Sequence, residues 1–125
     1  MRLIADLTGY ELCYLATPYS KFPGGLEAAA IAACKLAGRL MQADVRVYSP
    51  IAHSHFIAKC AKIDPIDHDF WLHQDDAFLD MADALLIAEF PGWQESRGIN
   101  YEFDVMRGQK KDIYYINPET LAIRM

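Results

Sequence analysis

Four short apolar runs, separated by stretches with helical periodicity, restrict the fold of this sequence more than any other feature. Runs of this length that stay apolar throughout are typical of strands buried on both faces of a sheet. The strands are expected at residues 12–16, 45–50, 82–90 and 112–117, with 121–125 as a candidate edge strand. The expected helices lie at residues 26–44, 53–61, 64–82 and 96–109.

Strands that alternate with helices through short connections form a parallel sheet covered on both faces. We therefore expect an α/β fold of three layers, an open, mostly parallel sheet of four to five strands with helices on both faces, as in flavodoxin-like or Rossmann-like proteins. A chain of 125 residues is expected to form one domain, residues 1–125. In such sheets ligands bind beyond the carboxyl ends of the strands, so the loops at 17–25, 49–55 and 90–98 are the expected site.

Charge and composition argue against several classes of partner. The net charge is −5 and the Lys and Arg residues are scattered, so a nucleic-acid polymer is not an expected partner. The sequence has no run of 18 apolar residues and no signal-peptide layout at its start. We therefore expect a cytoplasmic protein that does not bind membranes.

Metals and common cofactors are not expected either. The 3 cysteines are odd in number and lack CxxC spacing, which argues against a structural disulfide and a cysteine-based zinc site. The 4 histidines show no HExxH spacing. The sequence also lacks the GxGxxG and GxxxxGKS/T loops that bind dinucleotides and ATP.

Glu102 is the first candidate for chemistry. If Ser96 caps a helix, none of the residues three or four positions from Glu102 is polar, so its carboxyl group is expected on the side that faces the sheet. Gly98, one turn earlier, leaves space for a ligand, and the Ser96 hydroxyl with the free N–H groups of the first turn forms a natural anion site. The alternative is that Ser96 only caps the helix and Glu102 only borders the interface.

Asp75 is the second candidate. All four residues at three and four positions from it are apolar, and loss of solvent raises the pKa of such a carboxyl group. An acid with a raised pKa can donate a proton near neutral pH. Tyr14, near the end of the first strand, is placed to orient Glu102. The alternatives are a solvent-facing or capping role for Asp75 and a core role for Tyr14.

Several side chains in the expected loops are candidates for binding a substrate. His53 and His55 are expected to line the loop after the second strand. There they either contact a phosphate or a sugar hydroxyl group of the ligand or only pack against other side chains. The remaining candidates are Pro18, Tyr19, Ser20 and Trp93.

A resemblance to a known family is carried by three segments, in this order: YLATPYS (14–20), DDAFLDMADALLIAE (75–89) and SRGINYEF (96–103). An acid stands eight residues before the Asp that opens the third strand, and a Ser-x-Gly-x-x-x-Glu loop follows. With this spacing the chain resembles the nucleoside 2-deoxyribosyltransferase-like superfamily. In motif it is most similar to the 2′-deoxynucleoside 5′-monophosphate N-glycosidases and small uncharacterised relatives.

The resemblance implies a role for each of five residues. Glu102 matches the nucleophile that attacks C1′ of the sugar, Asp75 the acid that assists departure of the base, and Tyr14 the tyrosine that positions the Glu. Ser96 matches a serine that binds the 5′-phosphate, and Gly98 a glycine that lets the ligand approach. The resemblance also implies a homodimer or homotetramer.

The sequence departs from the transferase pattern at Asp104, where transferases have Gly, and at Ser96-Arg97, which favours a phosphorylated substrate over base exchange. We expect an enzyme that hydrolyses the N-glycosidic bond of a (deoxy)nucleoside 5′-monophosphate through a covalent glycosyl–Glu102 intermediate. The alternatives are a non-catalytic nucleotide or nucleotide-sugar binding module, and a deoxyribosyltransferase. Glu102 and Asp75 facing one cavity, with carboxyl groups roughly 5–8 Å apart, would favour the enzyme. Carboxyl groups on opposite sides of the sheet would favour the binding module or a plain structural role.

Overall fold

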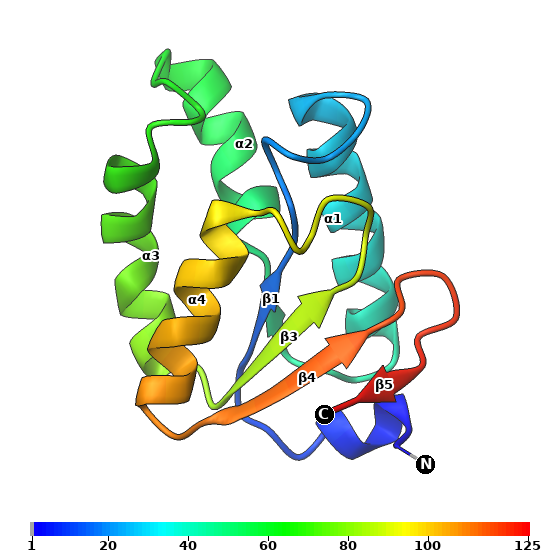
Figure 1. Cartoon of the computed structure of the whole chain (residues 1–125). Helices are drawn as coiled ribbons and strands as arrows, with labels where there is room; N and C mark the ends of the chain where they lie inside the picture. The colour runs from blue at the N-terminus through cyan, green and yellow to red at the C-terminus, as the bar shows by residue number, and fades with distance from the viewer. Residues whose placement is uncertain (1) are drawn as a thin grey trace.

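A five-stranded sheet forms the centre of the protein, whose computed structural model describes residues 2–125 (Figure 1). The strands run in the order β2-β1-β3-β4-β5, with β1–β4 parallel and β5 antiparallel to β4. They are β1 (Cys13–Ala16), β2 (Val47–Tyr48), β3 (Ala84–Ala88), β4 (Asp112–Ile116) and β5 (Ile123–Arg124). The expected α/β class, with a mostly parallel sheet of this size, is confirmed.

Helices cover both faces of the sheet. In Figure 1, α1 lies on one face, α3 and α4 lie on the other, and α2 lies near the upper ends of β1 and α1. The helices are α1 (Leu26–Gln42), α2 (Pro50–Ala61), α3 (His68–Met81) and α4 (Arg97–Gly108), with a 3-10 helix, η1 (Ile4–Leu7), near the N-terminus. The structure therefore has three layers, as expected. The 3-10 helix η1 is an additional element that the sequence pattern did not predict.

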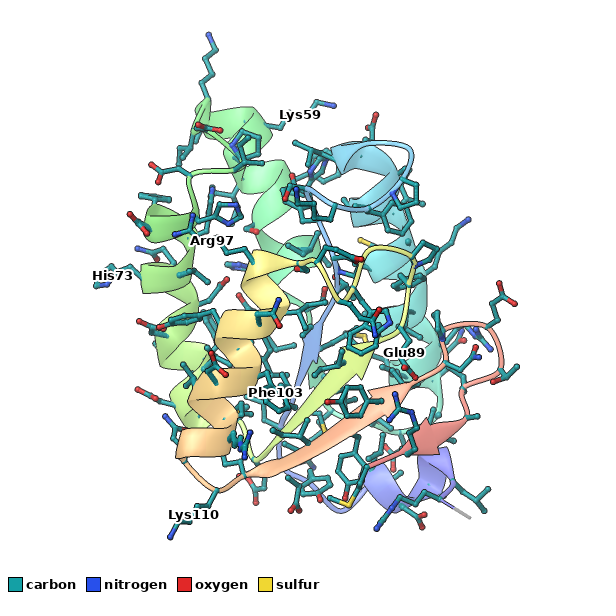
Figure 2. All side chains as sticks on the ribbon, in the orientation of Figure 1. Lys59, His73, Glu89, Arg97, Phe103 and Lys110 are labelled. Atoms are coloured by element: carbon teal, nitrogen blue, oxygen red, sulfur yellow. The ribbon has the colours of Figure 1, made fainter. Side chains whose placement is uncertain are left out.

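Each face of the sheet has its own apolar core, and side chains fill the space between the sheet and its helices (Figure 2). Leu15 of β1 packs with Leu36 and Leu40 of α1. Successive side chains of a strand point to opposite faces. Tyr14 therefore belongs to the other core, with Met106 of α4. This register places the Tyr14 ring on the side of the sheet where α3 and α4 lie.

The strand order fixes where a crevice opens. The chain leaves β1 toward α1 on one face and leaves β3 toward α4 on the other, so the two connections diverge at the carboxyl ends of adjacent strands. This divergence is the topological switch point at which open α/β sheets bind ligands. The loop after β1 and the start of α4 meet there.

The connection between β2 and α2 differs from the expected one. The strand ends at Tyr48, and the helix begins at Pro50 rather than at His53. Ser49 is the N-cap, because its Oγ accepts the N–H of Ala52 at 3.2 Å, and Pro is favoured at the first helical position. The segment expected as a loop at 49–55 is therefore mostly helix.

The start of α3 also differs, by four residues. Asp64 does not begin the helix, because its carboxylate accepts the N–H of Ile66 at 3.0 Å within a turn. Asp67 is the N-cap instead, and its Oδ1 accepts the N–H of Phe70 at 3.4 Å. The remaining helix and strand ends agree with the expected ones to within a few residues.

Within residues 2–125, no helix has the length and apolar character needed to cross a membrane.

Candidate functional site

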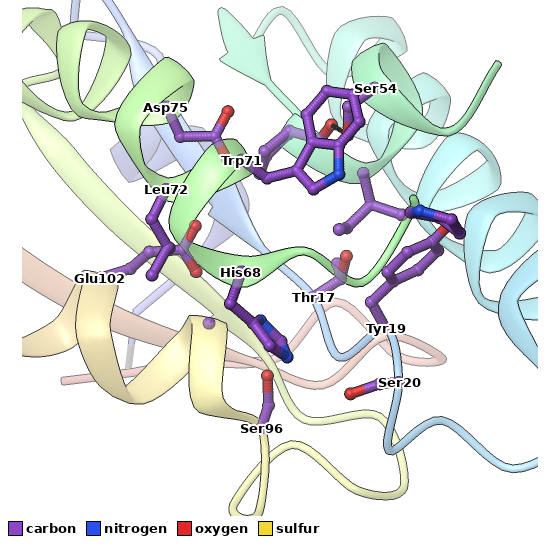
Figure 3. A pocket seen from close by; sticks show the side chains of 14 residues that line it. Thr17, Tyr19, Ser20, Ser54, His68, Trp71, Leu72, Asp75, Ser96 and Glu102 are labelled. Atoms are coloured by element: carbon purple, nitrogen blue, oxygen red, sulfur yellow. Dashed lines mark hydrogen bonds between the residues drawn. The ribbon is translucent and has the colours of Figure 1, made fainter. Parts of the chain in front are cut away.

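A cavity of about 60 Å³ lies at the carboxyl ends of β1 and β3 (Figure 3). Its walls come from the loop after β1, from the first halves of α2, α3 and α4, and from the turn before α3. Ten residues besides His55 were expected at the site, and six of them line this cavity: Tyr19, Ser20, Asp75, Ser96, Gly98 and Glu102. The crevice that the topology predicts is therefore the place where these side chains meet.

Helix α4 brings Glu102 to the cavity. Ser96 caps the helix, as expected, and its Oγ accepts the N–H of Ile99 at 3.2 Å. The buried face of this amphipathic helix holds Ile99, Glu102 and Met106, so the carboxyl group of Glu102 lies among apolar side chains and is only 5% exposed. Gly98 leaves open space one turn above it, because a Cβ there would meet only Ser96 Oγ, at 3.9 Å.

Helix α3 brings Asp75 to the same cavity. Asp75 and Leu79 are the buried residues of α3, and Asp75 is 8% exposed. Figure 3 shows the carboxyl groups of Asp75 and Glu102 on the same side of the cavity, carried by different helices. The arrangement expected for a catalytic pair, two carboxyl groups facing one cavity, is present.

Burial raises the pKa of both carboxyl groups. The pKa of Glu102 rises to about 8, mainly because the side chain loses solvent and also because Asp75 is negatively charged. The pKa of Asp75 rises to about 6 through loss of solvent and the charge of Asp76. The sequence predicts a raised pKa for Asp75, and the structure adds a larger rise for Glu102. Near pH 7 the pair therefore holds one proton.

The Tyr14 ring lies beneath the two carboxyl groups and is fully buried. Both carboxylates act on the Tyr14 hydroxyl and, together with burial, raise its pKa far above the usual range. The hydroxyl in turn lowers the pKa of Glu102 and of Asp75. No carboxyl oxygen reaches it with ordinary hydrogen-bond geometry, so the contact is looser than a hydrogen bond. Such contacts often tighten only when substrate binds.

The other four expected residues do not line the cavity of Glu102. Tyr14 lies in β1 and is fully buried behind the residues that line the cavity. Pro18 is a buried residue of the loop after β1. His53 is exposed on α2, with its Nδ1 3.2 Å from the hydroxyl of Tyr48, on the far side of Asp75. Trp93 packs edge-to-face on Tyr115, with ring centroids 5.6 Å apart.

His55 has a supporting role in the geometry of the site. It lies in α2 and not in a loop, and its Nδ1 is 2.7 Å from the hydroxyl of Tyr19. This hydrogen bond fixes the ring of Tyr19 at one end of the cavity. The position of His55 follows from the early start of α2, which the sequence pattern did not predict.

Eight further residues line the cavity and were not expected there, and four of them carry a polar group in the side chain: Thr17, Ser54, His68 and Trp71. Thr17 directly follows β1 and is buried, with no hydrogen-bond partner for its Oγ1. Trp71 donates its Nε1–H to the carbonyl oxygen of Asp64 at 2.8 Å, which holds the indole against the cavity. A sequence signal existed for Thr17, which stands at the carboxyl end of a predicted strand, and for Trp71, one helical turn before Asp75.

Within residues 2–125, no group of three or more His, Cys, Asp or Glu side chains is arranged to hold a metal ion.

The fold and the cavity define an α/β protein with a buried acidic pair at its switch point. The chain belongs to the family described as a domain of unknown function, DUF1937, whose sequence profile matches residues 11–117. The matched region contains every residue that lines the cavity. No curated protein matches the sequence.

Proposed function

We propose that the protein hydrolyses the N-glycosidic bond of a nucleoside or deoxynucleoside 5′-monophosphate. The observation that carries this proposal is the meeting of two buried carboxyl groups, Glu102 and Asp75, in one cavity at the N-terminus of α4. Glycosidic chemistry needs two carboxyl groups in different environments, one to attack the anomeric carbon and one to protonate the leaving group. The substrate class comes from the resemblance of the sequence to the nucleotide N-glycosidases.

In the first step, a carboxylate oxygen of Glu102 attacks C1′ of the sugar, and the bond between C1′ and the base nitrogen breaks. The electron pair of that bond stays with the base, which takes the proton of Asp75. In the second step, water attacks C1′ of the resulting ester and transfers a proton to Asp75. The sugar 5-phosphate leaves, and Glu102 returns to its carboxylate form.

The pair needs its single proton on Asp75 for this reaction. Between about pH 6 and pH 8 one proton is shared by the two groups, and it can move from one to the other as charge develops in the cavity. Positive charge that builds up at C1′ favours the ionised form of Glu102, the group next to it. Tyr14 supports the same form, because its hydroxyl lowers the pKa of Glu102.

The cavity must widen to admit the substrate. Its volume is about 60 Å³, whereas pockets that enclose small molecules measure roughly 300–1,000 Å³. The wall between Pro65 and Leu72 belongs to the turn before α3 and to the first turns of that helix. We expect it to move outward when a nucleotide enters.

A nucleotide-binding module without turnover is the second candidate, and one observation favours it. Burial raises the pKa of Glu102, so the fold favours the protonated form of this carboxyl group more than solvent does. A protonated Glu102 donates a hydrogen bond to a ligand and is not a nucleophile.

The test is a screen of the purified protein against the common ribonucleoside and deoxynucleoside 5′-monophosphates, with free base measured by chromatography. We expect the wild-type protein to release base from at least one of them. Glu102→Gln should abolish release, because the amide keeps the shape of the side chain but is not a nucleophile. Asp104→Asn, an exposed position on the same helix, is the matched control and should remain active.

Full activity of Glu102→Gln would refute the mechanism. No release from any nucleotide, together with thermal stabilisation by one of them, would establish the binding module instead.

A further inference from the structure

His68 is the one basic residue among the described residues that line the cavity of Glu102. It is the first residue of α3 and is half-buried. In Figure 3 its ring points toward Ser96, the N-cap of α4. Arg97 follows Ser96 in the chain but does not line the cavity; it pairs instead with the exposed Asp69 at 3.6 Å.

The same end of the cavity holds a buried hydroxyl group without a partner. Thr17 is 5% exposed, and its Oγ1 makes no hydrogen bond to any residue that the structure describes. A buried hydroxyl group that lacks a hydrogen-bond partner destabilises the fold. A ligand bound in the cavity would supply the missing partner. Helix α4 begins opposite, and the N–H groups of its first turn have no partner within the helix, apart from the one that Ser96 caps.

All of these groups can bind a compact anion. A hydroxyl, a helix N-terminus and an imidazole all donate hydrogen bonds, and the helix dipole adds positive potential. A phosphomonoester that enters this cavity also comes close to two acidic side chains, Asp75 and Glu102, which repel it. A cation is therefore needed on the other side, and within the described lining His68 alone can provide it.

We propose that His68 binds the phosphate of the substrate and, with Thr17 and the N-terminus of α4, makes the site specific for phosphorylated ligands. The inference rests on the proposed function in one respect, that the ligand carries a phosphomonoester. It names His68, which lies outside the three segments that carry the resemblance, as a specificity-determining residue.

Binding of ribose 5-phosphate and of inorganic phosphate, measured by isothermal titration calorimetry, tests the proposal without any need for turnover. His68→Gln keeps a hydrogen-bonding side chain but removes the possible charge. We expect it to weaken binding of ribose 5-phosphate by about tenfold or more, because a neutral hydrogen bond to the phosphate replaces one made by a cation. Binding of unphosphorylated ribose should be the same in both proteins.

Two further variants complete the test. His73→Gln lies on the same helix but on its outer side, where Figure 2 shows the ring pointing into solvent, and should bind ribose 5-phosphate like the wild type. Thr17→Val keeps the shape of the side chain and removes only the hydroxyl group. This variant should fold normally and should bind ribose 5-phosphate more weakly than the wild type does.

The proposal is overturned if His68→Gln binds ribose 5-phosphate as well as the wild type does, if His73→Gln is equally weakened, or if the wild type binds neither probe at millimolar concentration. Phosphate binding that depends on His68, in a protein that releases no base, would refute the proposed hydrolysis and leave this inference intact. Release of base at the same rate by His68→Gln and the wild type would support the proposed hydrolysis and refute the role of His68.

Discussion

Replacement of Glu102 by glutamine is expected to stabilise the protein at alkaline pH and to have little effect at acidic pH. The pKa of Glu102 is raised from 4.5 to about 8 by burial, so the folded state holds this proton more tightly than the unfolded state. Below pH 4.5 both states are protonated and the fold has its full stability. As the pH rises toward 8, the unfolded state loses the proton first and the folded state becomes less stable.

The size of the effect follows from the same values. A rise from 4.5 to about 8 corresponds to roughly 5 kcal/mol of unfolding free energy at about 1.4 kcal/mol for each pH unit. This figure is an upper limit, because water that enters the cavity at high pH solvates the ionised carboxylate and reduces the penalty. Glutamine has no proton to lose, so the variant avoids this loss of stability.

Urea denaturation between pH 4.5 and pH 9 measures the effect. The stability difference between Glu102→Gln and the wild type should be smallest near pH 4.5 and should reach several kcal/mol near pH 9. Asp104→Asn, exposed on the same helix, is the control and should follow the wild type across the range. A parallel pH dependence in Glu102→Gln and the wild type would refute the reasoning, since it would show that Glu102 ionises as readily in the folded protein as in the unfolded chain.

Two other substitutions test how the site is built. Tyr14→Phe removes a buried hydroxyl that has no ordinary hydrogen-bond partner, so thermal denaturation at pH 5 should show unchanged or higher stability, while the rate of base release falls about tenfold. A clear loss of stability would show that this hydroxyl is a structural group. Gly98→Ala has room for its methyl group and should gain roughly 0.5–1 kcal/mol of stability as a helical residue, while nucleotide binding weakens because the methyl group occupies the ligand space. Unchanged nucleotide affinity in this variant would place the ligand elsewhere.

The part of the site on α4 was predictable from sequence because local rules determine it. Ser96 has the chemistry of an N-cap, and the apolar positions around Glu102 repeat with the period of a helix. The structure has this helix at Arg97–Gly108, with the Glu102 carboxyl group on its buried face. The same reasoning applied to Asp75, whose neighbours on α3 are apolar, but the sequence left open whether the two carboxyl groups share one cavity or lie on opposite sides of the sheet.

The part of the site near His68 was not predictable in this way. The path of residues 62–67 depends on contacts between elements, among them the hydrogen bond from Trp71 Nε1 to the Asp64 carbonyl oxygen. The sequence pattern predicted a start at Asp64, whereas in the structure Asp64 accepts a hydrogen bond within a turn and Asp67 caps α3. Where α3 begins determines whether His68 reaches the cavity.

His53 shows a different limit of the sequence pattern. Residues 45–50 were expected to form a short strand that ends at Pro50, whereas the strand ends at Tyr48 and the helix starts early. Ser49 and Pro50 form a typical helix start. In the prediction from sequence, the apolar residues before them were given more weight than this signal. The consequence is that His53 points away from the cavity of Glu102, toward Tyr48.

The central claim, that Glu102 forms a covalent bond to the sugar, is tested most directly by mass spectrometry of the protein quenched during turnover of its best nucleotide. We predict that the peptide containing Glu102 carries the added mass of the sugar phosphate and that Glu102→Gln carries none. Turnover by the wild-type protein with no adduct on this peptide, even at the shortest quench times, would contradict the claim and indicate direct attack by water.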